Sequence, residues 1–506
     1  MEKIAPPKIV FDSHDMDLQE FKKLGYEVID QITDYYASIR ERSIISKNDS
    51  KTIEQVFNQP LPLIGQPAKD IIHEWQEKVL PNATHLGSPR YFGFVNGSGS
   101  MISVLADALA TSVNMNSGGW KAGPAATEIE RKTISWLAEM IHYPVDCGGL
   151  FLGGGTIANF SALLTAFRNK AEYDSTKEGL QSENRKGRYT IYMSDHEGHI
   201  SIVKAADMLN LGRNCIRRVP SNDDFTLNAE ALEKMLDDDI NAGMIPFCIV
   251  AQVGSINVGV VDPLEEIARI CQEKNLWFHA DGACGAVGSM LPEKAHLYKG
   301  LEKADSISLD PHKWLYIPYE CGCLLVKNAD MLRRTFSTSA PYLQSTLPTD
   351  YNGLDYFDYG PQMSRGFNAL KIWMTIKLYG KEGYQQLLRQ NIACAVRLSE
   401  LVKASDDFIS IQDPELFIYS FRFFPAALRE KENDTRLNAY LDRMNQRITD
   451  TIMATGFAFI MTSRIRNQVV IRLSICSHRT TLEDIEAVFK KLHETGSSLF
   501  KEEGFD

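Results

Sequence analysis

The sequence predicts an α/β protein whose core is a mostly parallel β-sheet covered by helices on both faces. Three observations lead to this prediction: short strand-like apolar segments, helical windows between them, and strands that lack a polar face. A helical window at 263–274 places Leu264, Ile267 and Ile270 on one side. Strands that are apolar on both faces and alternate with helices are typical of covered parallel sheets. The strand candidates are 190–194, 247–253, 276–281, 305–309 and 322–326.

The pattern divides the 506-residue chain into three parts. Residues 1–95 contain one helical stripe, at 18–42, followed by a polar connector and a proline-rich segment, so we expect an arm that cannot fold alone. Residues 96–380 carry the alternating pattern of a large domain. Residues 381–506 combine a long helix, two strand-like segments and a final amphipathic helix, which predicts a smaller α+β domain.

Composition limits the class of function. The chain has 54 Lys and Arg against 65 Asp and Glu, a net charge of −11, and no long basic run, which argues against nucleic-acid binding. The most apolar window, 244–261, is interrupted by Pro246, Gln252 and Asn257, so we expect no membrane span. Nine cysteines without a Cys-x-x-Cys pair, and an N-terminus without a signal-peptide pattern, lead us to expect reduced thiols and a cytoplasmic location.

Two candidate site residues follow predicted strands. Lys313 comes after the strand at 305–309, and a lysine at the mouth of a buried sheet suits Schiff-base chemistry if burial lowers its pKa. A lone lysine at such a place is more often a solvent-exposed loop residue. Asp281 ends the strand at 276–281, where its carboxylate could hold a protonated ring nitrogen or only cap a turn.

Two further segments contain glycines and histidines. Gly153-Gly154-Gly155-Thr156 opens a helical window, and backbone N–H groups at a helix start suit a phosphate. The segment lacks both Gly-x-Gly-x-x-Gly and Gly-Lys-Ser/Thr, which argues against a dinucleotide or P-loop site. His199 lies in His-Glu-Gly-His; because His-Glu-x-x-His is absent, we expect no metal, and ring stacking or a structural role stay open.

These four features occur in the order Thr156, His199, Asp281 and Lys313. A phosphate-type helix start, a histidine, a strand-end carboxylate and a strand-end lysine together suit an aromatic aldehyde that carries a phosphate and a protonatable ring nitrogen. The conjunction therefore predicts pyridoxal 5'-phosphate as the cofactor.

Over nearly its whole length the chain resembles the group II pyridoxal-phosphate-dependent decarboxylases, the family of aromatic-L-amino-acid decarboxylase. Asp-Pro-His-Lys-Trp at 310–314 is similar to the family's cofactor-lysine signature, and His-Ala-Asp-Gly-Ala at 279–283 resembles its His-Val-Asp-Ala-Ala. The bacterial tryptophan decarboxylases look nearer still, through 90–95 and 116–119. Other segments that resemble the family are 88–94, 120–130, 365–373 and 472–476.

The resemblance implies the type I pyridoxal-phosphate fold, similar to aspartate aminotransferase, with a seven-stranded, mostly parallel sheet in the large domain. It also implies roles for individual residues. Lys313 would carry the cofactor, and Asp281 would pair with the pyridine nitrogen so that the ring acts as an electron sink. His199 would stack on the ring, and Ala283 would pack against its other face.

For the phosphate and its surroundings, the resemblance implies Gly155, Thr156 and His312. Asp310 departs from the pattern, because the animal enzymes commonly have an asparagine there. A carboxylate would repel the phosphate, which puts a polar contact from this position in doubt.

Tyr342 matches the tyrosine of the family's mobile loop, whose role is to protonate the substrate Cα after carbon dioxide leaves. Relatives with phenylalanine at this position resemble enzymes that produce an aldehyde by oxidation. Tyr342 together with His199 therefore favours simple decarboxylation to an amine. As a bare loop tyrosine it could equally have a packing role.

The resemblance also indicates a substrate pocket. Gly118 should leave room for a wide ring such as indole, and Asn116 adds a polar group. In these segments only Arg90 could balance a side-chain carboxylate, so tryptophan, phenylalanine, tyrosine or a hydroxylated relative rank before acidic substrates. The expected pocket residues are Leu86, Phe94, Val95, Asn116 and Gly118.

The family further implies a homodimer with the site at the subunit interface, in which residues 1–95 clasp the partner. Three alternatives stay open: an aldehyde synthase or transaminase, a decarboxylase of a non-aromatic amino acid, and a non-catalytic binding dimer. The filled catalytic positions argue against the last. The missing glycine fingerprint argues against a Rossmann dehydrogenase.

Overall fold

The computed structural model describes residues 16–338, 353–431 and 436–505. By compactness the chain divides into two units, Met1–His85 and Leu86–Asp506. The three-part division with boundaries after 95 and 380 stays a prediction. Along the described residues, every helix is too short or too polar to cross a lipid bilayer.

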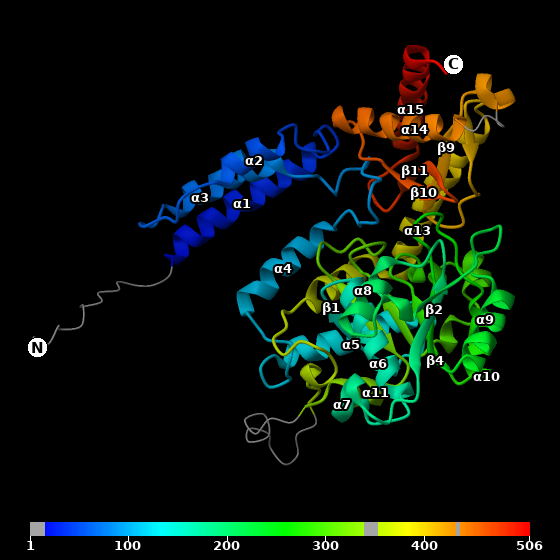
Figure 1. The fold of residues 1–506 in the computed structure, drawn as a ribbon. Helices are drawn as coiled ribbons and strands as arrows, with labels where there is room; N and C mark the ends of the chain where they lie inside the picture. The colour runs from blue at the N-terminus through cyan, green and yellow to red at the C-terminus, as the bar shows by residue number, and fades with distance from the viewer. Residues whose placement is uncertain (1–15, 339–352, 432–435, 506) are drawn as a thin grey trace, which may run out of the picture. The chain divides into compact units, whose positions relative to one another are not determined.

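The first unit is helical (Figure 1). The Asp17 carboxylate begins α1 by accepting hydrogen bonds from the backbone N–H groups of Gln19 and Glu20, as expected of an N-cap. Of the α1 side chains, only Leu24 is buried within this chain. The helices of this unit are α1 (Leu18–Ser38), α2 (Ser50–Phe57) and α3 (Ala68–Glu74).

The second unit contains two sheets and the helices that cover them. Its helices are α4 (Met101–Val113), α5 (Pro124–Met140), α6 (Gly155–Lys170), α7 (Ser175–Glu178), α8 (Ile200–Met208), α9 (Ala229–Asn241), α10 (Leu264–Glu273), α11 (Ala329–Phe336), α13 (Ala369–Lys403), α14 (Leu437–Ala454) and α15 (Leu482–Glu503). Its strands are β1 (Gly148–Leu152), β2 (Arg188–Ser194), β3 (Ile216–Val219), β4 (Met244–Gln252), β5 (Trp277–Asp281), β6 (Ser306–Leu309), β7 (Gly322–Val326), β8 (Phe408–Ser410), β9 (Ile418–Phe423), β10 (Met461–Ile465) and β11 (Gln468–Ser474).

The larger sheet has seven strands in the order β1-β7-β6-β5-β4-β2-β3. Strands β3, β2, β4, β5 and β6 pair in parallel, whereas β7 runs antiparallel to both of its neighbours. The predicted fold class, a mostly parallel sheet, is thus confirmed. The connection 310–321 between β6 and β7 holds the candidate lysine and no crossover helix, which is consistent with the antiparallel direction of β7.

Both faces of this sheet are buried, as the unbroken apolar strands predicted. Ile191 and Met193 of β2 belong to a core cluster that includes residues of α6, α8 and α11. Tyr192, which points to the opposite face, belongs to a cluster that includes residues of α5, α9 and α10. Successive strand residues therefore fill two separate apolar layers.

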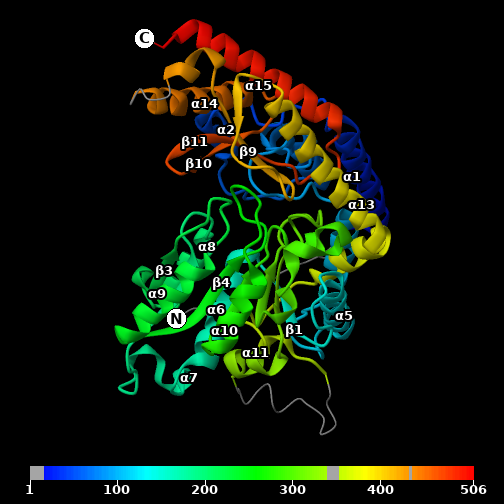
Figure 2. The ribbon, with the colours of Figure 1, turned by 90° about the vertical axis from the view of Figure 1, so that its right-hand side faces the viewer.

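The smaller sheet is antiparallel, in the order β10-β11-β9-β8. It shares a core with α14, α15 and the C-terminal half of α13. Figure 2 shows α13 extending from the large sheet to this second sheet. The helix is interrupted at Gly380, whose φ of 63° leaves the helical region. This is the predicted small α+β domain.

The sheet topology decides where the chemistry-bearing segments meet. Asp281 at the end of β5 pairs in register with Gln252 of β4 and Ser308 of β6. Helix α6 begins directly after β1, and the Lys313 loop follows β6. Because the carboxyl ends of parallel strands lie at one edge of a sheet, these segments meet there.

Candidate active site

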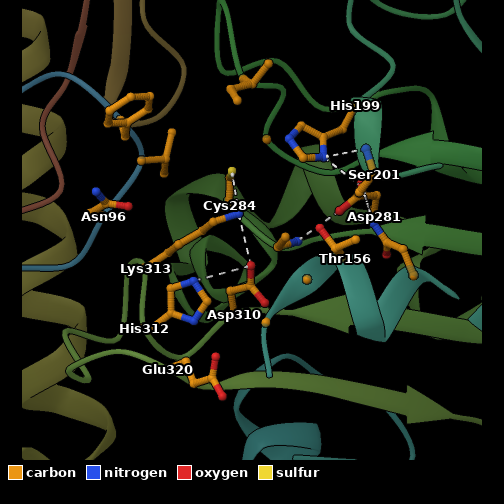
Figure 3. A pocket seen from close by; sticks show the side chains of 18 of the residues that line it. Asn96, Thr156, His199, Ser201, Asp281, Cys284, Asp310, His312, Lys313 and Glu320 are labelled. Carbon is orange, nitrogen blue, oxygen red and sulfur yellow. Dashed lines mark hydrogen bonds and ion pairs between the residues drawn. The ribbon is translucent and has the colours of Figure 1, made fainter. Parts of the chain in front are cut away.

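A cavity of about 340 Å³ lies at this edge of the sheet. Its lining includes Thr156 at the start of α6, His199 just before α8, Asp281 at the end of β5, and Lys313 after β6 (Figure 3). Four features that sequence reasoning linked only by their order therefore surround one space.

Lys313 is held by negative charge. Its Nζ lies 3.0 Å from Asp310 Oδ2 and 3.6 Å from Cys284 Sγ. Desolvation acts to lower the pKa of Lys313, but Cys284, Asp310 and Asp281 outweigh it and raise the pKa above its usual value. Burial raises the pKa of the Cys284 thiol, which leaves the two carboxylates as the effective charges at neutral pH. The pKa of Lys313 is thus raised, opposite to the lowering that burial alone would cause, because the neighbouring negative groups outweigh desolvation.

Asp281 is anchored on both of its oxygens. Oδ2 accepts a hydrogen bond from Asn159 Nδ2 at 3.1 Å, and Oδ1 accepts one from the Ser308 hydroxyl at 3.1 Å. All three side chains are buried. The carboxylate is thus fixed in place at the cavity wall, where it suits a protonated ring nitrogen.

His199 is the N-cap of α8 and faces the same cavity. Its Nδ1 lies 2.7 Å from the Ser201 hydroxyl. Burial lowers the pKa of His199, more than the neighbouring Asp281 carboxylate raises it. The ring is therefore neutral at neutral pH, which suits stacking on an aromatic group.

The start of α6 forms a cradle for an anion. Gly154, at a φ of 100°, is the N-cap and offers no side-chain cap to the first turn of this 16-residue helix. A Cβ at Gly155 would lie 2.7 Å from Asp310 Oδ2, so a larger residue there would have to displace the Asp310 carboxylate. Thr156 adds a hydroxyl to the same wall. Uncapped N–H groups at a helix start are the groups that bind a phosphate.

One group opposes an anion at this end. Asp310 is buried, and its Oδ1 has no hydrogen-bond partner among the described residues. His312 lies beside it and points Nδ1 at the carbonyl of Cys321, 2.6 Å away. The lysine, the ring-nitrogen partner and the helix start fit pyridoxal phosphate, and the charge of Asp310 is partly balanced by Lys313.

The expected substrate residues fall into two groups. Phe94 and Val95 line the cavity together with Ile256. Leu86, Asn116 and Gly118 lie outside its lining, and their role in substrate binding stays a prediction.

Asn116 and Gly118 have local partners instead. Asn116 Oδ1 accepts the backbone N–H groups of Gly118 at 2.9 Å and Arg365 at 3.0 Å. A side chain at Gly118 would collide with the carbonyl oxygen of Met363. Close packing is thus a second reason for a glycine where the sequence suggested room for a ring.

The remaining expected cofactor residues, Gly155, Ala283 and His312, all line the cavity. Tyr342 lies outside the described residues. Sequence reasoning missed Asn159, which contacts Asp281, and Ser201, which contacts His199. An asparagine inside the small and apolar pattern of α6, one turn after the phosphate-type start, was the available signal for Asn159.

The fold and the cavity define an enzyme that binds pyridoxal phosphate at the carboxyl edge of a parallel sheet. The pyridoxal-dependent decarboxylase conserved domain matches residues 51–424. The chain therefore belongs to the pyridoxal-dependent decarboxylases, as the resemblance indicated, and is a carboxy-lyase.

Individual relatives agree over almost the full length. The chain is 30% identical over 477 residues to an aromatic-L-amino-acid decarboxylase of Bacillus atrophaeus, covering 94% of this chain and 95% of that protein. It is 27% identical over 462 residues to a phenylacetaldehyde synthase of a Rosa hybrid cultivar, covering 91% and 90%. The structure of Catharanthus roseus tryptophan decarboxylase in complex with L-tryptophan superposes with a TM-score of 0.85 at 25% identity, covering 96% and 100%.

Proposed function

We propose that this enzyme converts an aromatic L-amino acid to the corresponding amine and carbon dioxide, with Lys313, Asp281 and His199 as its catalytic residues. The observation that carries the proposal is the convergence of a lysine, an anchored carboxylate and an uncapped helix start on one cavity. The similarity to aromatic-amino-acid decarboxylases of bacteria and plants supports it.

The character of the cavity supports an uncharged side chain on the substrate. Phe94, Val95 and Ile256 provide apolar surface. Among the lining residues that the structure describes, Lys313 is the only lysine or arginine. Since Lys313 is needed for the cofactor, no lysine or arginine among these described lining residues is left to balance a second carboxylate, and burying such a group unpaired is costly.

Bound pyridoxal phosphate supplies an electron sink for the bond between the substrate Cα and its carboxylate. In our proposal Lys313 holds the cofactor, and Asp281 keeps a proton on its ring nitrogen through a charge-assisted hydrogen bond. The neutral ring of His199 would stack on one face of the cofactor ring. Tyr342 delivers the proton to Cα, a role that rests on the resemblance to the family.

We further propose that the enzyme is a cytoplasmic homodimer in which residues 1–95 clasp the partner. The first unit exposes large apolar side chains, including Leu18, Phe21, Leu61 and Leu63, a surface that favours association. All nine cysteines are free thiols, in keeping with a reducing compartment. Sedimentation analysis would test the dimer, and a monomer at micromolar concentration would contradict it.

A second candidate is an aldehyde synthase, because phenylacetaldehyde synthases of rose and petunia are among the relatives. It differs in its reaction: it consumes one dioxygen and one water per amino acid, and it releases an aldehyde, ammonia and hydrogen peroxide together with the carbon dioxide.

One experiment tests both. The enzyme loaded with pyridoxal phosphate is incubated with single L-amino acids, products are identified by mass spectrometry, and peroxide is recorded. We expect one amine per carbon dioxide without peroxide, best with an aromatic substrate, and no turnover by Lys313→Ala. An aldehyde with peroxide would favour the second candidate, and turnover by Lys313→Ala would refute the role of the lysine.

A further inference from the structure

A continuous row of buried polar side chains runs behind the cavity. It begins at Trp277 Nε1, which donates to Ser306 Oγ at 2.8 Å, and Ser306 Oγ lies 2.8 Å from His279 Nδ1. His279 Nε2 lies 3.0 Å from Asn159 Oδ1, and Asn159 Nδ2 donates to Ser201 Oγ at 2.8 Å. Ser201 Oγ in turn lies 2.7 Å from His199 Nδ1. Every member except His199 is buried.

The donors and acceptors can be assigned from the Trp277 end. An indole N–H can only donate, so Ser306 Oγ accepts from Trp277 and keeps its own hydrogen available for His279 Nδ1. Burial lowers the pKa of His279 to about 4, so the ring is neutral and carries one hydrogen. That hydrogen is then on Nε2 and points to Asn159 Oδ1.

The contact between Asn159 and Asp281 leads independently to the same position for the His279 hydrogen, on Nε2. Asn159 Nδ2 lies 3.1 Å from Asp281 Oδ2, and an ionised carboxylate only accepts. The amide nitrogen of Asn159 must therefore face Asp281, which leaves its oxygen for His279. With its orientation fixed from both sides, Asn159 gives one hydrogen to Asp281 and the other to Ser201.

The row ends at His199 with only one consistent arrangement. Ser201 Oγ accepts from Asn159 and keeps its own hydrogen available for His199 Nδ1. The backbone N–H of Ser201 also points at Nδ1, at 3.3 Å. Nδ1 is thus an acceptor, and the single hydrogen of the neutral His199 ring is on Nε2, which is turned away from Ser201 (Figure 3).

We propose that Asn159 is a positioning residue that joins Asp281 to His199 and, through Ser201, fixes His199 as the tautomer that carries its hydrogen on Nε2. The cavity is then offered an imidazole donor and a carboxylate acceptor held by the same amide. The catalytic consequence rests on the proposed function, whereas the hydrogen-bond direction does not. Groups that orient a reacting side chain from behind commonly control its tautomer.

The direction can be tested without turnover. The holoenzyme is labelled with ¹⁵N-histidine, and the His199 signals are assigned by comparison with His199→Gln. We expect a single tautomer, with Nδ1 unprotonated and Nε2 protonated, at neutral pH. In Ser201→Ala we expect the two nitrogen shifts to move toward each other as the tautomers mix. A wild-type ring protonated on Nδ1 would overturn the proposal.

The coupling is tested by cofactor affinity and turnover. Asn159→Ala should weaken pyridoxal phosphate binding and kcat by about tenfold each, whereas Ser201→Ala should lower only kcat. The double variant should lose no more kcat than Asn159→Ala alone, because the same chain is already broken. Asn169→Ala, on the same helix with its amide bonded to the Thr165 carbonyl, is the control and should change neither.

Additive losses in the double variant would refute the coupling. If Asn159→Ala fails to fold, the wild-type tautomer and Ser201→Ala still decide the matter. If no L-amino acid is converted to an amine although the tautomer is as expected, the proposed function fails and the positioning role stands.

Discussion

The two ends of the cavity differ in how completely the protein satisfies its own polar groups. At the Asp281 end, both carboxylate oxygens accept hydrogen bonds from buried side chains, and the row of donors behind them is continuous. At the α6 end, the helix start lacks a side-chain cap, and Asp310 Oδ1 is buried without a partner among the described residues.

This contrast separates two tasks. The ring-nitrogen end is rigid before any ligand arrives, which is the arrangement that electrostatic stabilisation requires, because no reorganisation is needed during the reaction. The α6 end has backbone N–H groups without a side-chain cap and the buried carboxylate of Asp310, whose charge opposes an anion. We therefore expect changes at the Asp281 end to affect the chemical step and changes at the α6 end to affect cofactor binding.

The largest effect should come from Asp281→Ala. Removing the anchored carboxylate removes the group that stabilises charge on the ring nitrogen, so kcat should fall roughly 10²–10³-fold in steady-state assays at saturating cofactor. Asp239→Asn is the control: Asp239 is a buried carboxylate on α9 that pairs with Arg217 of β3 and does not line the cavity. It should leave kcat unchanged; an equal loss in both variants would point to a general defect.

The next effect concerns stability. Because burial lowers the pKa of His279 to about 4, the unfolded chain binds a proton below pH 6.5 that the folded chain does not. The free energy of unfolding should therefore fall as pH drops from 6.5 to 4, by about 3 kcal/mol from this residue. His279→Gln should flatten part of that slope in denaturant titrations.

His478, whose pKa burial lowers to about 3, should supply part of the slope that remains in His279→Gln. If the free energy of unfolding of His279→Gln kept the same pH dependence, His279 would not be the buried neutral imidazole described here.

At the α6 end, Asp310→Asn should tighten pyridoxal phosphate binding about tenfold, because it removes a negative charge near the anion and one of the groups that, with Cys284 and Asp281, raise the pKa of Lys313. Equilibrium titration by absorbance would measure it. Glu320→Gln, which removes an exposed carboxylate from the same lining, should have a smaller effect because water screens it. Weaker binding by Asp310→Asn would mean that holding Lys313 outweighs repulsion.

The smallest effect should be that of Thr156→Ala. Losing one hydroxyl from the helix start should weaken cofactor binding by about fivefold, the equivalent of one ordinary hydrogen bond. Thr156→Ser keeps the hydroxyl and should bind as the wild type does. A loss in both variants would assign Thr156 to packing.

The difference between the two ends also explains what sequence reasoning could reach. The five predicted strands are all present because burial on both faces leaves unbroken apolar segments. Strands β1 and β3 were missed. Strand β1, Gly148–Leu152, begins with two glycines, and β3, Ile216–Val219, contains two arginines and is only partly buried. The direction of β7 was not predictable either, since a pattern shows burial and not pairing.

Within the site, residue types next to strand ends predicted Lys313, Asp281 and Thr156 as candidates. What could not be predicted depends on distance between segments: the raised pKa of Lys313 requires Asp310 and Asp281 nearby in space, and the role of Asn159 requires contacts from three other elements. The hydrogen bond from the backbone N–H of Arg365 to Asn116 Oδ1 was not predictable either, because the two residues are far apart in the chain.

Two glycines behind the Asp281 loop limit how this site can change over evolutionary time. A Cβ at Gly254 would lie 2.6 Å from the Cα of Gly285, and one at Gly285 would lie 2.7 Å from the Cα of Gly254. Each position is blocked by the backbone of the other glycine. A second substitution therefore cannot make room for a side chain, because the neighbouring residue has no side chain to shorten. Random mutagenesis with selection for activity should therefore recover glycine at both positions, while the apolar wall formed by Phe94 and Ile256 stays open to new specificities.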